Sequence, residues 1–338
     1  MIYRLGLIVN PHAGRGWEAN VPIARQLADA LRPNALLVGA DEMGADALTD
    51  WTGARVVLDY APAQGRARTT ALVRDMVARG VEVIAVVGGD GTLADVAFTL
   101  FRARASLPIL GVGVGSANVG GLVTVLGSDV ARLAAARLEP RALDALIAGV
   151  NGETLGMAFN DVVVSTTVLA TVDGELTEVQ VGPKQSGENI PGRSKLIWTL
   201  ATHVWRASPA GQVTVARGDQ VGTLICGLPD SRFFGKAIAG QACLAAYLDL
   251  PAGCLVGSHP LVRMVTSAAE LMRDEPFVSR FASFDEDSTI KATGLRPGVA
   301  LCADGNPLKI LTPDDQVTIG VRRRCTVALR LVRDEGSP

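Results

Sequence analysis

The residues of this chain best suited to chemistry form a glycine-rich segment that contains one carboxylate. Val86-Val87-Gly88-Gly89-Asp90-Gly91-Thr92 ends an apolar run and comes just before a stretch with helical spacing. Glycines let a backbone approach a phosphate closely, and a helix N-terminus supplies amide donors with a partial positive charge. Asp90 would repel phosphate unless it accepts a proton from an attacking hydroxyl or binds Mg²⁺. The alternative is a tight turn in which Asp90 or Thr92 caps the helix.

Two further glycine-rich segments follow other apolar runs. Asn10-Pro11-His12-Ala13-Gly14 comes after the first run, and Gly111-Val112-Gly113-Val114-Gly115-Ser116-Ala117-Asn118 follows the fifth. Open parallel sheets bind ligands at the carboxyl ends of their strands, so these loops would share one edge. Each loop alone fits a simple turn. Three together predict a nucleotide site, because a nucleotide needs its phosphates, ribose and base held at once.

Elements that would position these loops alternate regularly over the first 140 residues. Strands are predicted at Arg4–Val9, Ala35–Val38, Arg55–Asp59, Glu82–Val87 and Pro108–Val112. Helices are predicted at Trp17–Leu31, Gly65–Arg79, Thr92–Arg104 and Asp129–Ile147. This alternation predicts a Rossmann-like α/β domain over residues 1–140, with a parallel sheet covered by helices on both faces.

Short β-rich runs dominate from about Gly152 onward and predict a mostly antiparallel second domain over residues 141–338. The predicted strands are Leu155–Val168, Val213–Val215, Gly222–Cys226, Val299–Cys302, Gln316–Val321 and Thr326–Val332. Turns are expected at Asp173-Gly174 and Asp304-Gly305, and a helix at Lys236–Leu248.

A polar pair interrupts the first of these β-rich runs. Asn160 and Asp161 stand inside an otherwise apolar strand, Ala158–Val164. Buried polar groups need partners, which a ligand in an interdomain cleft could supply. A turn at the end of a strand is the alternative interpretation.

Composition excludes several classes of protein. The chain has 338 residues, of which 48% are hydrophobic, and its net charge is −2, which argues against disorder and against a polyanionic partner. Five widely spaced cysteines and no signal peptide favour a reducing, cytoplasmic location. We expect a homo-oligomer that binds small nucleotides and neither nucleic acid nor a membrane.

Several of these motifs resemble a known family. Gly88–Thr92, followed by Asn160-Asp161, resembles the ATP-dependent NAD kinases, and Cys302–Gly305 with Asp315–Ile319 looks like the closing hairpin of that family. The form of Asn10–Gly14 is similar to the first loop of diacylglycerol and sphingosine kinases, which share the superfamily. Most similar is the divergent NAD kinase-like branch that includes the acetoin-catabolism X proteins.

The resemblance implies an α/β domain followed by a β-sandwich domain, with ATP as phosphoryl donor and NAD as acceptor. Asp90 would be the base that removes the proton of a ribose 2′-hydroxyl. Asn160 and Asp161 would hold NAD, and Mg²⁺ or another divalent cation would screen the phosphates, with no metal ligand assigned. The nucleotide-binding set would be Asn10, Gly14, Gly88, Gly89, Gly91, Thr92, Gly115, Ser116 and Asn118.

Two departures from the family pattern leave alternatives open. The NAD kinase signature rich in Thr, Ser, Gly and Tyr is absent, and Gly187–Lys195 occupies roughly its region. Lipid kinases usually carry Glu after the late Asp-Gly, where this chain has Asn306, which argues against a diacylglycerol or sphingosine kinase. A nucleotide-binding regulatory protein without turnover is the third reading, and the presence of Asp90 argues against it.

Overall fold

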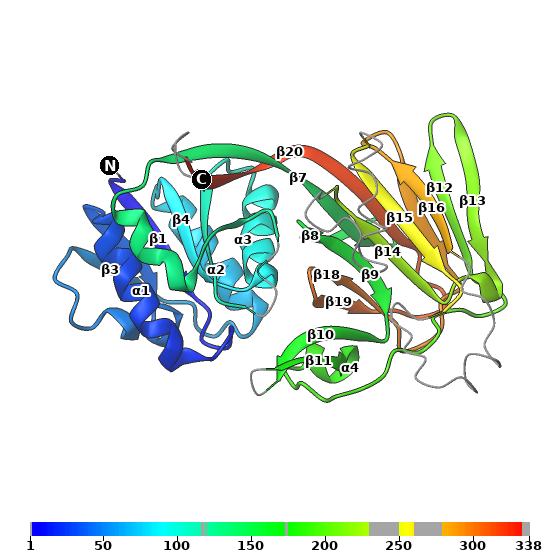
Figure 1. Ribbon diagram of the computed structural model, residues 1–338, viewed down its shortest axis with the longest axis horizontal. Coiled ribbons are helices and arrows are strands. Elements are labelled where there is room, and N and C mark those ends of the chain that lie inside the picture. The colour runs from blue at the N-terminus through cyan, green and yellow to red at the C-terminus, as the bar shows by residue number, and fades with distance from the viewer. Residues whose placement is uncertain are drawn as a thin grey trace, which may run out of the picture. The chain divides into compact units, whose positions relative to one another are not determined.

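The computed structural model describes residues 2–115, 118, 120–172, 175–229, 250–259 and 279–332 (Figure 1). Ser116, the Asp173-Gly174 turn and the predicted helix Lys236–Leu248 lie outside this range. Contacts divide the described chain into two compact units. One contains the residues up to Leu143 and those from Arg324 onward, and the other contains most of Asp144–Arg323.

The first unit is a parallel sheet with helices on both faces. Its strands are β1 (Arg4–Val9), β2 (Ala35–Gly39), β3 (Arg55–Leu58), β4 (Val83–Gly88), β5 (Pro108–Gly113) and β6 (Val123–Leu126). Its α-helices are α1 (Trp17–Leu31), α2 (Arg66–Ala78) and α3 (Asp90–Ala103). The strand order is β5-β4-β1-β2-β3, and β6 pairs with the outer side of β5. The predicted α/β class and the parallel sheet are therefore confirmed.

Burial explains why these runs form strands. All six residues of β4 and five of the six in β1 are buried, as expected when helices cover both faces of a sheet. Leu5 and Leu7 belong to one core cluster with residues of α1. Gly6 points the other way, where a Cβ would lie 2.7 Å from the Met76 sulfur of α2. Helix α3 packs beside α2, so α1 covers one face and α2 with α3 the other (Figure 1).

The prediction of a helix over Asp129–Ile147 is wrong. A 3₁₀ helix, η3 (Gly127–Ala134), is followed by a long strand, β7 (Leu138–Val150). Pro140 lies in that strand, and proline inside an α-helix would remove a hydrogen bond and clash with the preceding turn. Pairing of β7 with β8 (Glu153–Ala158) then decides the structure, since Leu146 aligns with Ala158 and both side chains are buried.

Two antiparallel sheets form the second unit and confirm the predicted sandwich class. In addition to β7 and β8 its strands are β9 (Asp161–Ser165), β10 (Thr167–Val172), β11 (Glu175–Gln180), β12 (His203–Ser208), β13 (Gly211–Arg217), β14 (Thr223–Gly227), β15 (Ala252–Gly257), β16 (Ser279–Phe284), β17 (Thr289–Thr293), β18 (Ala300–Ala303), β19 (Asn306–Ile310) and β20 (Val317–Leu331). One sheet contains β13-β12-β17-β20 with β7 and β8, and the other has the order β16-β15-β14-β9-β18-β19. A single cluster of buried residues from both sheets is the core.

Strand β20 joins the two units covalently. Val317–Gly320 pairs with β17 in the second unit, and Val327-Ala328 pairs in parallel with β5 in the first. The sequence predicted two strands here, Gln316–Val321 and Thr326–Val332, whereas the structure has one. Arg322, Arg323 and Arg324 lie between them and are exposed.

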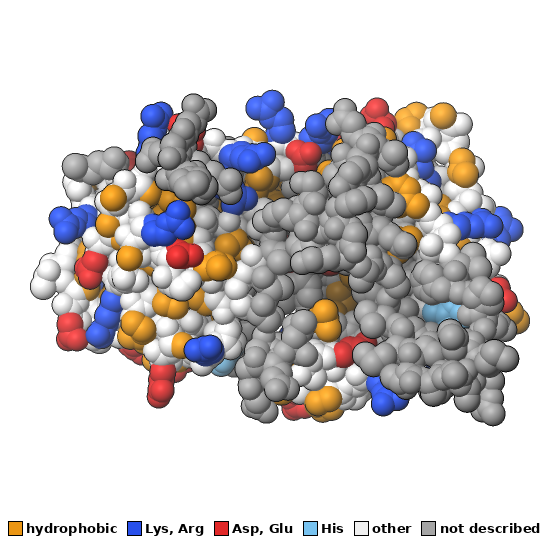
Figure 2. Space-filling model, viewed as in Figure 1, with side chains coloured by type: hydrophobic (Ala, Val, Ile, Leu, Met, Phe, Trp, Pro, Cys, Tyr) orange, Lys and Arg blue, Asp and Glu red, His pale blue; other side chains and the backbone are white. Residues whose placement is uncertain are grey.

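The remaining elements are small. Strands β10 and β11 form a separate two-stranded sheet that precedes the five-residue helix α4 (Val181–Gln185). In the described part of the chain, no helix is long and apolar enough to span a membrane. Figure 2 shows basic and acidic side chains interspersed over the described surface of the face that it draws.

Candidate active site

The glycine-rich segment forms the connection between β4 and α3. Gly88 ends the strand, Gly89 is the N-cap with extended φ and ψ of −92° and 176°, and Asp90 is the first helical residue. Asp90 is half-buried. Within the described chain no side chain caps this helix end, so the interpretation of Asp90 or Thr92 as a cap is wrong. An uncapped N-terminus presents amide donors and the positive end of the helix dipole.

Three loops meet here through their backbones. A Cβ on Gly115 would lie 2.9 Å from the Gly89 Cα, and a Cβ on Gly14 would lie 1.8 Å from the Val114 carbonyl oxygen. The Val114 amide donates to the Gly88 carbonyl at 3.0 Å. Only residues without side chains permit such approach at Gly14 and Gly115. The structure therefore brings together the loops after β1, β4 and β5, as the sequence predicts.

Asn10 links the first loop to the second. Its Nδ2 donates to the Thr92 Oγ1 at 2.7 Å, and its Oδ1 accepts the His12 amide at 3.0 Å. Sequence reasoning missed Asn20, which is 1% exposed and donates to the carbonyls of Asn10 and Ala13. The signal was a polar residue on the apolar face of α1, next to a glycine-rich loop.

The Asp90 carboxylate is held by the loop that follows β5. The Gly120 amide donates to the Asp90 Oδ1 at 2.9 Å, and a Cβ on Gly120 would lie only 2.7 Å from that oxygen. In the residues that follow Gly120, the carbonyls of Gly121 and Val123 accept hydrogen bonds from the Arg330 guanidinium. The end of β20 thus fixes the segment that orients Asp90.

Asn118 has a buried acceptor without a partner. The residue is in the left-handed region with φ of 50°, and its Nδ2 donates to the Gly115 carbonyl at 2.5 Å. Its Oδ1 is buried and finds no hydrogen-bond partner within the described residues. Buried polar atoms are nearly always paired, so this oxygen is a candidate contact for a ligand or cation at the loop edge.

Sequence reasoning also missed an ion pair further along α3. The Arg66 Nε lies 2.5 Å from the Asp95 Oδ1, and the Asp95 residue is only 9% exposed. Burial raises the pKa of Asp95 to about 6, against the opposing effect of Arg66. Arg66 begins α2 and Asp95 lies in the second turn of α3, so the pair joins two neighbouring helices of this sheet. The sequence signal that could have revealed this pair was the Asp95 carboxylate within the predicted helix Thr92–Arg104.

In the second unit, Asn160 lies between two strands and Asp161 is the first residue of the second one. Strand β8 ends at Ala158 and β9 begins at Asp161, so the alternative of a turn at a strand end is correct. The Asp304 carboxylate accepts the amides of Phe159, Asn160 and Asp161 at 2.7, 2.9 and 3.1 Å. The protein itself therefore satisfies this backbone, without any need for a ligand.

Asp304 also begins the predicted Asp304-Gly305 turn, which joins β18 to β19 with φ of 44° and 77°. Its own amide donates to the Asp161 carbonyl at 3.0 Å. Turn and carboxylate together fix the position of Asn160 and Asp161. No local pattern in the sequence indicated that Asp304 would contact Asn160 and Asp161, which lie more than 140 positions earlier.

Among the described residues, no group of three or more His, Cys, Asp and Glu side chains could form a metal centre. Asp90 is the carboxylate of the glycine-loop edge. One carboxylate fits Mg²⁺, because this ion is usually held by one or two carboxylates together with substrate phosphates.

Comparisons with known proteins agree with this geometry. Residues 5–139 match the family model of the ATP-NAD kinase N-terminal domain. An uncharacterized protein of Archaeoglobus fulgidus is 31% identical over 322 residues, which cover 95% of this chain and 97% of that protein.

Two solved structures share the fold. Yeast NADH kinase complexed with NADH has a TM-score of 0.54 at 13% identity, covering 99% of this chain and 84% of that one. A candidate diacylglycerol kinase from Bacillus anthracis has a TM-score of 0.54 at 12% identity, covering 97% of both chains. The family match and the shared fold define a class: residues 5–139 are an ATP-NAD kinase N-terminal domain by sequence, and the whole chain has the fold of these two kinases, which supports a phosphotransferase. The motifs predict a relationship to the ATP-dependent NAD kinases, and the match over residues 5–139 agrees with that prediction.

Proposed function

We propose that this protein transfers the γ-phosphoryl group of ATP to the 2′-hydroxyl of NAD, giving NADP and ADP. The observation that carries the proposal is the Asp90 carboxylate, oriented by the Gly120 amide at the N-terminus of α3 among three glycine loops. Such a site supplies the positioning and charge stabilisation that phosphoryl transfer requires.

Asp90 is the base of the proposed reaction. It accepts the proton of the ribose 2′-hydroxyl as that oxygen bonds to the γ-phosphorus and the bond to the bridging β,γ-oxygen breaks. The α3 N-terminus and the loop amides stabilise the charge that develops on the phosphoryl oxygens. Nucleotide contacts are assigned to Asn10, Gly14, Gly88, Gly89, Gly91, Thr92, Gly115, Ser116 and Asn118.

The acceptor would be held by the second unit. Asn160 and Asp161 lie in a turn that Asp304 makes rigid, which suits side chains that position a ribose or adenine. A divalent cation such as Mg²⁺ would neutralise the ATP phosphates. Residues 1–140 would serve mainly the donor and 141–338 the acceptor.

The proposal includes a cytoplasmic homo-oligomer. The cytoplasm supplies both ATP and NAD at working concentrations, and the charge of −2 does not favour a polyanionic partner. Light scattering of the purified protein measures the oligomeric state directly.

The decisive experiment is an enzyme-coupled assay for NADP with purified protein, Mg²⁺, ATP and NAD. Asp90→Asn should lose at least about 100-fold in kcat while ATP affinity changes little, because the amide cannot take the proton. Asp29→Asn, an exposed site on α1, is the matched control and should keep full activity. An active Asp90→Asn enzyme would contradict the assignment.

Two other outcomes would replace the proposal. Phosphorylation of diacylglycerol in vesicles without NADP formation would favour a lipid kinase. Saturable binding of ATP and NAD without any product would identify a regulatory nucleotide-binding protein.

A further inference from the structure

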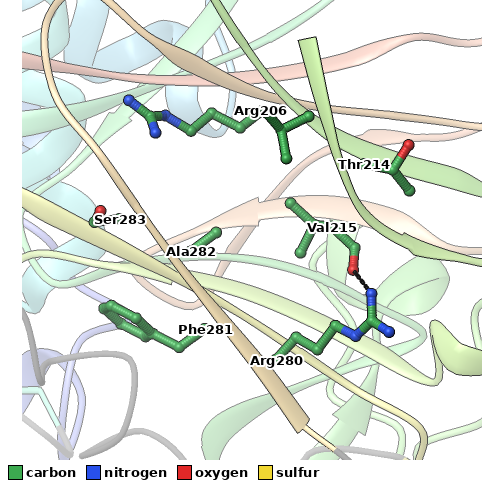
Figure 3. Close-up of a pocket in the computed structure, with 8 residues that line it drawn as sticks. Arg206, Thr214, Val215, Arg280, Phe281, Ala282 and Ser283 are labelled. Atoms are coloured by element: carbon green, nitrogen blue, oxygen red, sulfur yellow. Dashed lines mark hydrogen bonds between the residues drawn. The ribbon is translucent and has the colours of Figure 1, made fainter.

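A second region with chemical potential lies at one end of the sandwich in the second unit. A cavity of about 440 Å³ opens where β12 and β13 of one sheet face β16 of the other (Figure 3). It is lined by both apolar and cationic side chains. Its volume is within the range of sites for small organic molecules.

Two arginines occupy positions that point into the sandwich. On β12, Arg206 aligns with Ile290 of β17, which belongs to the core. On β16, Arg280 aligns with Val256 of β15, which also belongs to the core. Directly aligned residues on paired strands share a face, so both arginines belong to the inward faces of their strands, where Arg206 is half-buried and Arg280 is exposed.

The two guanidinium groups differ in their partners. An Arg280 Nη donates to the Val215 carbonyl at 2.9 Å, which links β16 to β13 (Figure 3). The Arg206 Nε is buried and has no hydrogen-bond partner among the residues that the structure describes. In the described part of the chain, neither arginine forms a salt bridge with an acidic side chain. A buried donor without an acceptor is costly, so an acceptor from outside the chain would be favoured.

The side chains that line the cavity indicate which chemical groups that acceptor has. Figure 3 shows Val215 and Ala282 between the two arginines, so apolar surface lies next to positive charge. Arginine presents a planar fork of donors that matches carboxylate and phosphate oxygens. We propose that this cavity binds a small organic anion, a carboxylate or phosphate monoester with an apolar portion, through Arg206 and Arg280. The site consists of second-unit residues and does not depend on the proposed NAD phosphorylation.

Two aromatic probes distinguish the anionic groups. Calorimetry with 4-bromophenyl phosphate and with 4-bromobenzoate measures affinity, and soaked crystals locate the bromine by anomalous scattering. We expect at least one probe to place its bromine in the cavity. Binding of one probe alone identifies phosphate or carboxylate as the recognised group. Phosphate binding at the glycine loops would appear as a separate peak.

Variants separate ligand binding from a structural role. Arg206→Gln should raise the Kd of the bound probe at least 10-fold, whereas Arg322→Gln, an exposed arginine of the same unit, should not change it. Arg206→Leu should raise the Tm of the ligand-free protein, because it removes the unpartnered donor, and should abolish the Tm increase caused by the probe. Equal probe affinity in wild type and Arg206→Gln, or no bromine peak in the cavity, would overturn the proposal.

Discussion

Around Asp90 the first unit positions its polar groups by bringing glycine backbones into contact, whereas around Asp304 the second unit uses a carboxylate to hold the backbone. At the first place, Gly14 and Gly115 have no side chains, so backbone atoms of neighbouring loops lie only 1.8 and 2.9 Å from the positions that their Cβ atoms would occupy. At the second, three amides of one turn converge on a single carboxylate.

The difference shows how to read an acidic residue in a turn. Asp90 and Asp304 both belong to Gly-containing turns that the family resemblance singles out. Asp304 organises backbone that would otherwise be unsatisfied, so its removal should cost stability. Asp90 is itself organised by the backbone of another loop, so its removal should cost chemistry. The predictions below test this distinction from the largest expected effect to the smallest.

Asp304→Ala should lower the free energy of unfolding by about 3–5 kcal/mol, because three amides lose a charged acceptor. Urea denaturation measures this change. Asp314→Ala, at an exposed position of the same unit, is the control and should change stability by less than about 0.5 kcal/mol. A similarly small effect of Asp304→Ala would refute the structural role.

Gly14→Ala should destabilise the loop edge by about 2–3 kcal/mol, since its Cβ would overlap the Val114 carbonyl and its φ is +62°. The Kd for ATP should rise about 10-fold or more. Gly16→Ala is the matched control: its φ is +88°, but no atom lies within 4 Å of its Cβ. Its effect should be confined to backbone strain of about 1 kcal/mol. Equal effects at both positions would show that loop contact is unimportant.

Two carboxylates should give the units opposite responses to pH. The pKa of Asp95 in the first unit is raised to about 6, chiefly by burial. Its native state binds the proton more tightly than the unfolded chain, so this group's contribution to stability falls as the pH rises from about 4 to 6. Asp95→Asn should remove up to about 3 kcal/mol of that pH dependence.

Asp315 in the second unit behaves in the opposite way. Burial would raise its pKa, but hydrogen bonds from Lys309 and Thr312 outweigh this and lower the pKa to about 2. Its contribution to stability is complete above about pH 4 and is lost as the pH falls toward 2. Asp315→Asn should flatten the stability profile in that acidic range, measured by urea denaturation. If Asp95→Asn or Asp315→Asn left the dependence of stability on pH unchanged, the role assigned to that carboxylate would be wrong.

Arg330→Gln should reduce kcat about 10-fold by loosening the Gly121–Val123 segment beside Gly120. The KM for NAD should change little, because Arg330 acts through the position of Asp90. Arg330→Lys should restore part of the rate, and Arg322→Gln should leave kcat unchanged. A loss confined to KM would instead place Arg330 in substrate binding.

Local patterns predicted most of the first unit from the sequence. Its strands are apolar runs separated by glycine-rich turns, and alternation with helices fixes a parallel sheet with one loop edge. The candidate site followed because each loop is local in sequence and strand order brings the loops together. Asn20 was missed because its partners are backbone carbonyls, and a backbone contact cannot be recognised from the types of the residues involved.

Long-range pairing decided what the sequence could not predict. Leu138–Val150 has apolar residues compatible with either period, and its pairing with β8 selects the strand. The turn at Asn160 depends on Asp304, far along the chain. The sequence analysis predicts no element at Arg206, and only the alignment of β12 with β17 places this residue beside Ile290 on the inward face.

The path of β20 has a consequence for biosynthesis. Strand β5 obtains its neighbour Val327-Ala328 from the last part of the chain, more than 200 residues after Pro108. Hence a ribosome must synthesise the chain through Ala328 before the parallel sheet is complete. Nascent chains halted before residue 317 should remain sensitive to protease in the first unit, and synthesis beyond β20 should bring protection of both units together.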